Sequence, residues 1–222
     1  MEKKHLLIVE GKEDQSLVEV LLKKTFKATI KNGKEPSQKI IEIPKNNWSV
    51  FIYNAGSDSQ AFTKLKIEIK NKEYQTIGII IDTDISIESR WQTFNDILNA
   101  NKEYKIPKKF NKNNLIFHLE DFLSVGIWLM PDNSNKGMLE DFVKKLIKKD
   151  DTLVGFAEET VAKLPDVRFK KSYTTKAVLH TWLAWQEQPN SDIWRGVENK
   201  YFDTEITICK EFIQWLKTLY NL

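Results

Sequence analysis

The chain alternates between short apolar runs and stretches whose apolar residues recur at helical spacing. Largely apolar runs lie at residues 6–9, 49–53 and 77–81, and such runs are typical of strands that are buried on both faces of a sheet. After the first run, Leu17 and Leu21 recur about one helical turn apart, which indicates an amphipathic helix. Strands that alternate with helices predict an α/β fold with a mostly parallel central sheet and helices on its faces.

Turn-forming residues and further apolar runs complete the predicted sheet. Residues 28–47 contain several Asn, Gly and Pro residues, so we expect an excursion there with room for a short hairpin. Two more strands are predicted at residues 115–119 and 125–130. Residues 99–114, rich in Asn and Lys and with one Pro, are expected to form a loop before them.

The C-terminal part of the chain has a different character. From about residue 150 onward the apolar pattern predicts helices and no strand. No linker rich in Gly, Ser or Pro separates these helices from the rest. We therefore expect a single domain over residues 1–222. Its core covers about residues 1–148, and a helical extension, residues 149–222, packs on that core.

Composition and charge limit the function only weakly. The 222 residues include 34 basic and 31 acidic side chains, a net charge of +3, so overall charge does not by itself indicate a nucleic-acid partner. The lysines between Lys102 and Lys112 fit either a solubilising loop or a phosphate-contacting patch. The single cysteine, Cys209, excludes an intrachain disulfide, and no long apolar stretch is present. We therefore expect a cytoplasmic protein without a membrane span.

Acidic residues follow two of the predicted strands. Glu10 comes directly after the first strand, and Asp82 and Asp84 follow the third. The carboxyl ends of parallel strands share one edge of a sheet, where ligands bind, so these side chains should converge. Clustered carboxylates repel each other unless a cation neutralises them, and Mg²⁺ or Mn²⁺ prefers oxygen ligands. Alternatively, Asp84 or Ser86 caps the following helix and Glu10 is a turn residue.

Two of these motifs resemble a known signature. LIVEGKEDQ and IGIIIDTD are similar to the Toprim signature, a Glu-Gly after the first strand and an Asp-x-Asp after a later one. Topoisomerases, bacterial primases, recombination proteins and nucleases of the overcoming-lysogenization-defect (OLD) type share it. VGIWLMPDNSNKGMLEDF and KAVLHTWLAWQEQP resemble a Toprim-like family of bacterial and archaeal proteins related to the OLD-type nucleases. This similarity covers nearly the whole chain.

The resemblance implies a Rossmann-like Toprim fold with a metal-dependent site. In Toprim enzymes the Glu is usually the general acid or base, a role that falls here on Glu10. The Asp pair coordinates one or two Mg²⁺ or Mn²⁺ ions, a role that falls on Asp82 and Asp84. Catalysis is thus expected to depend on these three residues, and all three are expected to be metal ligands.

OLD-type nucleases add acidic residues and a lysine at a second metal position. Asp132 and Glu140 are the main candidates here, with Asp141 and Lys136 beside them. Glu140 fits equally an exposed residue in the first turn of a helix, where the helix dipole favours an acid. The residues expected to contact nucleic acid are Lys12, Lys136 and Lys176.

The helix predicted at residues 175–186 combines a histidine with two tryptophans. Trp182 and Trp185 lie among apolar neighbours at helical spacing, so we predict that both belong to the core. The alternative is that His180 acts as a base or contacts phosphate while Trp185 stacks on a nucleobase. Nearby basic residues form either a basic rim or a solvated face, namely Arg168, Lys170, Lys171 and Lys176.

Two main classes of function follow. The first is a Mg²⁺- or Mn²⁺-dependent nuclease that hydrolyses DNA or RNA, as an effector subunit of a two-component OLD-like defence or repair system. The chain has no GxxxxGK[ST] phosphate loop, so the ABC-class ATPase of such a system would be a separate partner. The second is a non-catalytic Toprim-fold adaptor or nucleic-acid-binding protein. A phosphotransferase or hydrolase of small nucleotides is a weaker third class, and a homodimer is compatible with each.

Overall fold

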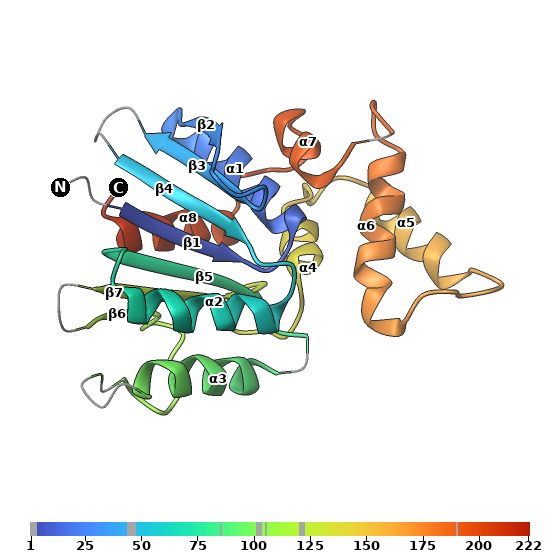
Figure 1. Cartoon of the computed structure of the whole chain (residues 1–222). Coiled ribbons are helices and arrows are strands. Elements are labelled where there is room, and N and C mark those ends of the chain that lie inside the picture. The colour runs from blue at the N-terminus through green and yellow to red at the C-terminus, as the bar shows by residue number, and fades with distance from the viewer. Residues whose placement is uncertain are drawn as a thin grey trace.

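The chain folds around one seven-stranded sheet with strand order β2-β3-β4-β1-β5-β7-β6, as Figure 1 shows. The computed structural model describes residues 4–43, 48–84, 86–100, 104, 106–119, 123–189 and 191–222. The strands are β1 (Lys4–Val9), β2 (Thr29–Asn32), β3 (Gln38–Ile43), β4 (Trp48–Asn54), β5 (Thr76–Asp82), β6 (Ile116–His118) and β7 (Ser124–Met130). The helices are α1 (Lys12–Phe26), α2 (Asp58–Asn71), α3 (Ile87–Asn99), α4 (Leu139–Lys144), α5 (Leu153–Ala162), α6 (Thr174–Ala184), α7 (Ile193–Glu198), α8 (Thr207–Tyr220) and the 3₁₀ helix η2 (Lys171–Tyr173).

The centre of the sheet is parallel, and antiparallel strands flank it on both sides. The neighbours β4, β1, β5 and β7 pair in parallel. On one side β3 pairs antiparallel with β4 and β2, which makes the short hairpin anticipated in the 28–47 excursion. On the other side β6 pairs antiparallel with β7. The expected α/β fold with a mostly parallel sheet is therefore confirmed.

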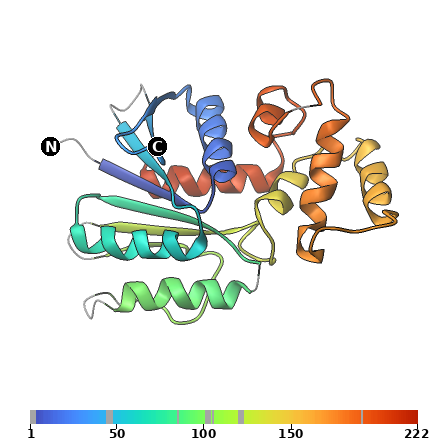
Figure 2. The same ribbon diagram turned by 45° about the vertical axis from the view of Figure 1, so that its right-hand side comes forward.

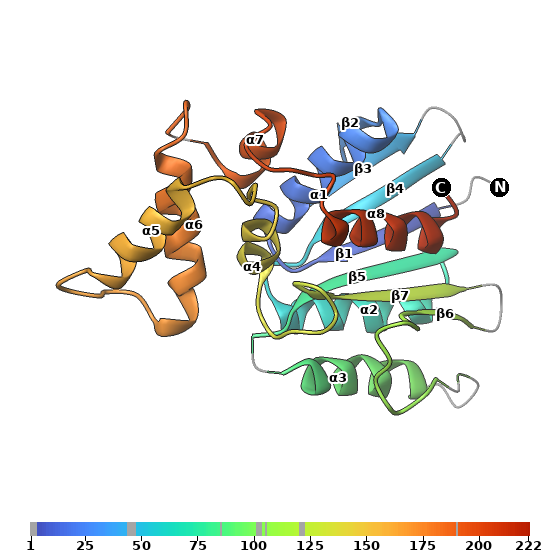
Figure 3. The ribbon, with the colours of Figure 1, turned by 180° about the vertical axis from the view of Figure 1, so that it is seen from behind.

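Helices cover both faces of the sheet. The helices α2 and α3 lie on one face (Figure 1), and α1 and α8 lie on the other, as seen from behind in Figure 3. The approach of α8 is close because Gly78 of β5 and Gly126 of β7 are paired across the sheet beneath it. A Cβ atom on Gly78 would lie 2.6 Å from the Tyr220 hydroxyl, and that hydroxyl donates a hydrogen bond to the Leu6 carbonyl at 2.7 Å.

The predicted C-terminal extension divides into two parts. Helix α8 packs on the sheet, whereas α5 and α6 pack on each other and α6 also contacts α4. We call residues 153–185 the arm. Figure 2 shows the arm beyond the carboxyl ends of the central strands. Because α4 follows β7 and starts at that same edge, the arm is held next to the side chains that follow the strands.

The lysine-rich loop and the expected lack of a membrane span can both be examined in the fold. Lys102 and Lys105 lie outside the described residues, and Lys108, Lys109 and Lys112 are exposed. Within the described part of the chain, none of the helices has the length and apolar character that a membrane span requires.

Candidate functional site

The acidic residues predicted at the strand ends are brought close together. Strands β1 and β5 are neighbours in the sheet and run parallel, so Glu10 and Asp82 emerge side by side. The Asp82 backbone N–H donates a hydrogen bond to Glu10 Oε2 at 3.3 Å. Asp84 lies two residues further on, and the following helix is capped by Ser86, whose hydroxyl accepts the Ser89 N–H at 2.9 Å. The capping role therefore falls to Ser86, and Asp84 does not serve it.

A fourth carboxylate, Asp14, joins this group from the first turn of α1. It is buried, with 7% of its surface exposed, and its Oδ2 accepts the Gly11 N–H at 3.0 Å. Its other oxygen, Oδ1, is buried without a hydrogen-bond partner. Burial raises the pKa of Asp14 to about 7, and the charges of Glu10 and Glu140 add to the effect. The sequence pattern did not indicate this residue, which lies in the first turn of α1.

The carboxyl of Asp82 is the most strongly perturbed of the set. Burial raises its pKa to about 9, and the neighbouring charges of Asp14 and Glu10 contribute. Its Oδ1 accepts the Leu139 N–H at 3.0 Å, which ties the end of β5 to the start of α4. Burial also raises the pKa of Glu10, against the hydrogen bond from the Asp82 N–H. These raised pKa values are expected for carboxyl groups that lie close together and are poorly exposed to water.

Glu140 completes the group, which we call the acidic site: Glu10, Asp14, Asp82, Asp84 and Glu140. Only 3% of Glu140 is exposed, so the alternative of an exposed first-turn residue is wrong. Its carboxylate forms an ion pair of 2.7 Å with Lys176 from α6, and the Lys176 ammonium is also 3.9 Å from Glu13. Burial alone would lower the pKa of Lys176, but its hydrogen bond and charge interaction with Glu140 raise it. The arm thus supplies a cation to the edge of the acidic site.

A second basic side chain approaches from α3. The Arg90 guanidinium forms an ion pair of 2.5 Å with Asp58, and its Nε–H donates to the Asp82 carbonyl at 3.0 Å. Burial raises the pKa of Asp84 despite the opposing attraction of Arg90. Arg90 therefore offsets part of the negative charge of the site, a role that the sequence pattern did not indicate.

One set of side chains in the described part of the chain has the spacing of a metal site. Glu13, Glu140 and His180 each offer a ligand atom, and these atoms lie within 4.8 Å of one another. Glu10, Asp82 and Asp84 lie near each other but do not form as tight a set among the described residues. Carboxylate and imidazole ligands together suit Mn²⁺ or Zn²⁺ better than Mg²⁺.

Other residues that the sequence singled out have local roles. Asp132 forms an ion pair with Lys145 and accepts two hydrogen bonds from Asn135, at 2.8 and 2.9 Å. Burial would raise the pKa of Asp132, but the hydrogen bonds from Lys145 and Asn135 outweigh it and lower the pKa. Asp141 accepts the Met138 N–H at 2.9 Å, so it caps α4. Lys12 and Lys136 are exposed.

Trp182 and Trp185 differ in their surroundings. Trp182 is buried, as predicted, and its ring N–H donates to Asp151 at 3.1 Å. Trp185 is 41% exposed at the end of α6, so its assignment to the core is wrong. A cavity of about 720 Å³ lies elsewhere, lined largely by residues of 112–118, 132–134 and α8. No member of the acidic site lines that cavity, although Asp132 does.

Comparison with known proteins gives a family and a fold. No curated protein matches the chain significantly. A crystal structure of hypothetical protein PH0156 from Pyrococcus horikoshii OT3 is similar, with a TM-score of 0.62 and 20% sequence identity over 98% of this chain and 95% of that chain. At this identity the likeness concerns the fold. The family described as "Protein of unknown function (DUF3226)" matches residues 4–221. The chain therefore belongs to the DUF3226 family.

Proposed function

We propose that the chain is a divalent-metal-dependent nuclease of the Toprim type, with its centre at the acidic site. The observation that carries the proposal is the meeting of five carboxylates from β1, α1, β5 and α4, with the buried Oδ1 of Asp14 left without a partner. A buried charge without a partner is costly. Several buried acidic groups in one place are therefore typical of a site that binds a cation. The resemblance of the Glu10 and Asp82 motifs to the Toprim signature agrees with this.

The side chains of the site fit a hard divalent cation. All five members offer carboxylate oxygens, the ligands that Mg²⁺ and Mn²⁺ prefer. Glu10, Asp14 and Asp82 would hold a first ion, because a cation there would give the orphaned Asp14 Oδ1 its missing partner. Glu13, Glu140 and His180 would hold a second. Lys176 bonds Glu140 at 2.7 Å and would have to move away for that second ion to bind.

The proposed reaction is hydrolysis of a phosphodiester bond. A bound metal ion would polarise a phosphoryl oxygen and lower the pKa of a coordinated water. Glu10 is the proposed proton carrier, because it lies at the strand end next to Asp82 and is only partly screened from solvent. Lys176 and Arg90 are the cations next to the site, and either can attract the negative phosphate.

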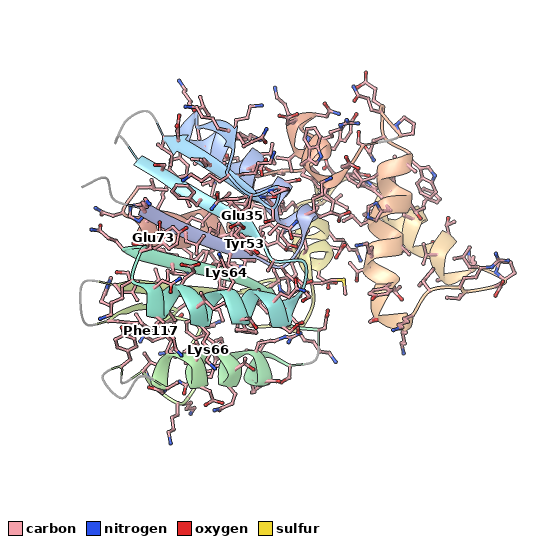
Figure 4. All side chains as sticks on the ribbon, viewed as in Figure 1. Glu35, Tyr53, Lys64, Lys66, Glu73 and Phe117 are labelled. Atoms are coloured by element: carbon pink, nitrogen blue, oxygen red, sulfur yellow. The ribbon has the colours of Figure 1, made fainter. Side chains whose placement is uncertain are left out.

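The test is a cleavage assay with plasmid, single-stranded DNA and tRNA in Mg²⁺ or Mn²⁺. We expect the wild type to cut at least one substrate, and we expect Glu10→Gln and Asp82→Asn to lose that activity. Glu73→Gln is the matched control: Glu73 pairs with Lys4 at 2.7 Å and lies at the end of the sheet opposite the arm (Figure 4). Equal cutting by wild type and Asp82→Asn would point to a contaminating nuclease. Metal binding without cutting of any substrate would favour the non-catalytic class.

A further inference from the structure

One face of α6 connects the acidic site to the surface of the arm. Lys176 and His180 lie next to Glu140 and Glu13, so the face that carries them is directed toward the acidic site. Tyr173, the N-cap residue of α6, precedes Lys176 by three residues and His180 by seven. Residues at this spacing lie on one face of a helix. Tyr173 therefore extends the same face outward from the site, and 45% of its surface is exposed.

A segment of net positive charge lies next to this tyrosine. Residues 163–176 contain five basic residues and one acidic residue, a net charge of +4, compared with +3 for the whole chain. Lys163 and Arg168 are paired with acidic neighbours. Lys170 and Lys171 are exposed and form no ion pair with any described residue. Because the acidic site repels a phosphate backbone, a basic surface next to it is needed to hold one.

The arm also carries most of the exposed apolar side chains. Of the seven large apolar side chains that are exposed in the described residues, six lie in the arm: Leu153, Phe156, Leu164, Val167, Tyr173 and Trp185. Three of them are aromatic. Exposed aromatic rings among lysines are the usual means by which proteins hold single strands, since the rings stack on unpaired bases while the lysines contact phosphates. The bases of a duplex already stack on each other and offer no free face.

We infer that the arm is a docking surface for single-stranded nucleic acid. An unpaired base stacks on Tyr173, Lys170 and Lys171 contact the phosphates on either side of it, and the strand continues along α6 to the acidic site. A single strand docked in this way would be the substrate of the proposed nuclease, and in that respect the inference rests on the proposed function. Strand binding itself requires neither metal nor cleavage.

The test is fluorescence anisotropy with a labelled oligonucleotide as single-stranded DNA, single-stranded RNA and duplex DNA, with EDTA present. The wild type should bind a single strand more tightly than the duplex. Tyr173→Ala should weaken single-strand binding by about 5- to 150-fold, and Tyr173→Phe should retain it, because loss of one base stack costs that much affinity. Changing both Lys170 and Lys171 to Ala should make the slope of log affinity against log salt less steep by about 1.4.

The matched control for charge is Lys66→Ala, because Lys66 is exposed on α2 away from the arm (Figure 4). It should leave binding unchanged. Tighter binding of duplex than of single strand, or equal binding by wild type and Tyr173→Ala, would overturn the inference. So would binding to a protein partner through the arm with no affinity for single strands. Strand binding by a protein that cuts nothing would retain the docking surface and reject the nuclease.

Discussion

Replacement of Asp14 by Asn should stabilise the metal-free protein at alkaline pH. Asp14 is almost fully buried next to Glu10 and Glu140, and its Oδ1 lacks a partner. Asn has the same shape and keeps a carbonyl oxygen that can accept the Gly11 N–H, the bond now made by Asp14 Oδ2. The substitution therefore removes the buried charge with little change in packing, and the free energy of unfolding reports the cost of that charge.

The magnitude follows from the pKa of the buried carboxyl. Asp14 has a pKa of about 7, against an ordinary value of 3.8, a difference of about 3 units at about 1.4 kcal/mol each. Because the native pKa is the higher one, the native state keeps its proton while the unfolded state loses it. Wild-type stability therefore falls as pH rises from about 4 to about 7. Relative to wild type, Asp14→Asn should gain about 4 kcal/mol between pH 4 and pH 8.

Urea unfolding in EDTA at several pH values from 4 to 8 measures this difference. Asp132→Asn is the matched control with the opposite sign: the pKa of Asp132 is lowered by Lys145 and Asn135, so its carboxylate stabilises the native state above its ordinary pKa. At pH 8, Asp14→Asn should be more stable than wild type and Asp132→Asn less stable. A stability difference between wild type and Asp14→Asn that stays constant with pH would show that Asp14 does not carry a raised pKa in the native state.

Two further predictions concern the core. Gly78→Ala should destabilise the protein by about 1–3 kcal/mol, because the new methyl group would lie 2.6 Å from the Tyr220 hydroxyl and 2.8 Å from Leu7; unchanged urea unfolding would contradict the tight packing of α8. Burial raises the pKa of the Cys209 thiol to about 11, so a thiol-specific reagent at pH 8 should modify it only after unfolding. Rapid modification of the native protein would show that the face of α8 that carries Cys209 is not packed against the core.

The sequence was most informative where the physical signal is local. Apolar runs predicted β1, β4, β5 and β7 to within about two residues, because a strand buried on both faces has few polar positions. The short helix α7 (Ile193–Glu198) was not predicted. Six residues are too few to show a helical period, and its stability comes from tertiary contacts, including those with α1.

The candidate site was predicted in part, and the misses have a common cause. Glu10 and Asp82 could be placed together because both follow neighbouring parallel strands. Asp132 was expected at the same edge because it follows the strand β7. It instead bonds to Asn135 of its own turn and to Lys145. Asp14 and the exposure of Trp185 could not be predicted, since both depend on where the arm and α1 pack. Periodicity describes one element at a time and does not show which face meets another element.

The most direct test of the acidic site is a Mn²⁺ titration followed by electron paramagnetic resonance, which measures free Mn²⁺. We expect that the wild type binds Mn²⁺, that Asp82→Asn loses the first ion, and that His180→Ala loses only the second. Glu73→Gln should titrate like the wild type. If wild type and Asp82→Asn bind Mn²⁺ equally, or if the wild type leaves all Mn²⁺ free, the carboxylates at this edge are not a metal centre.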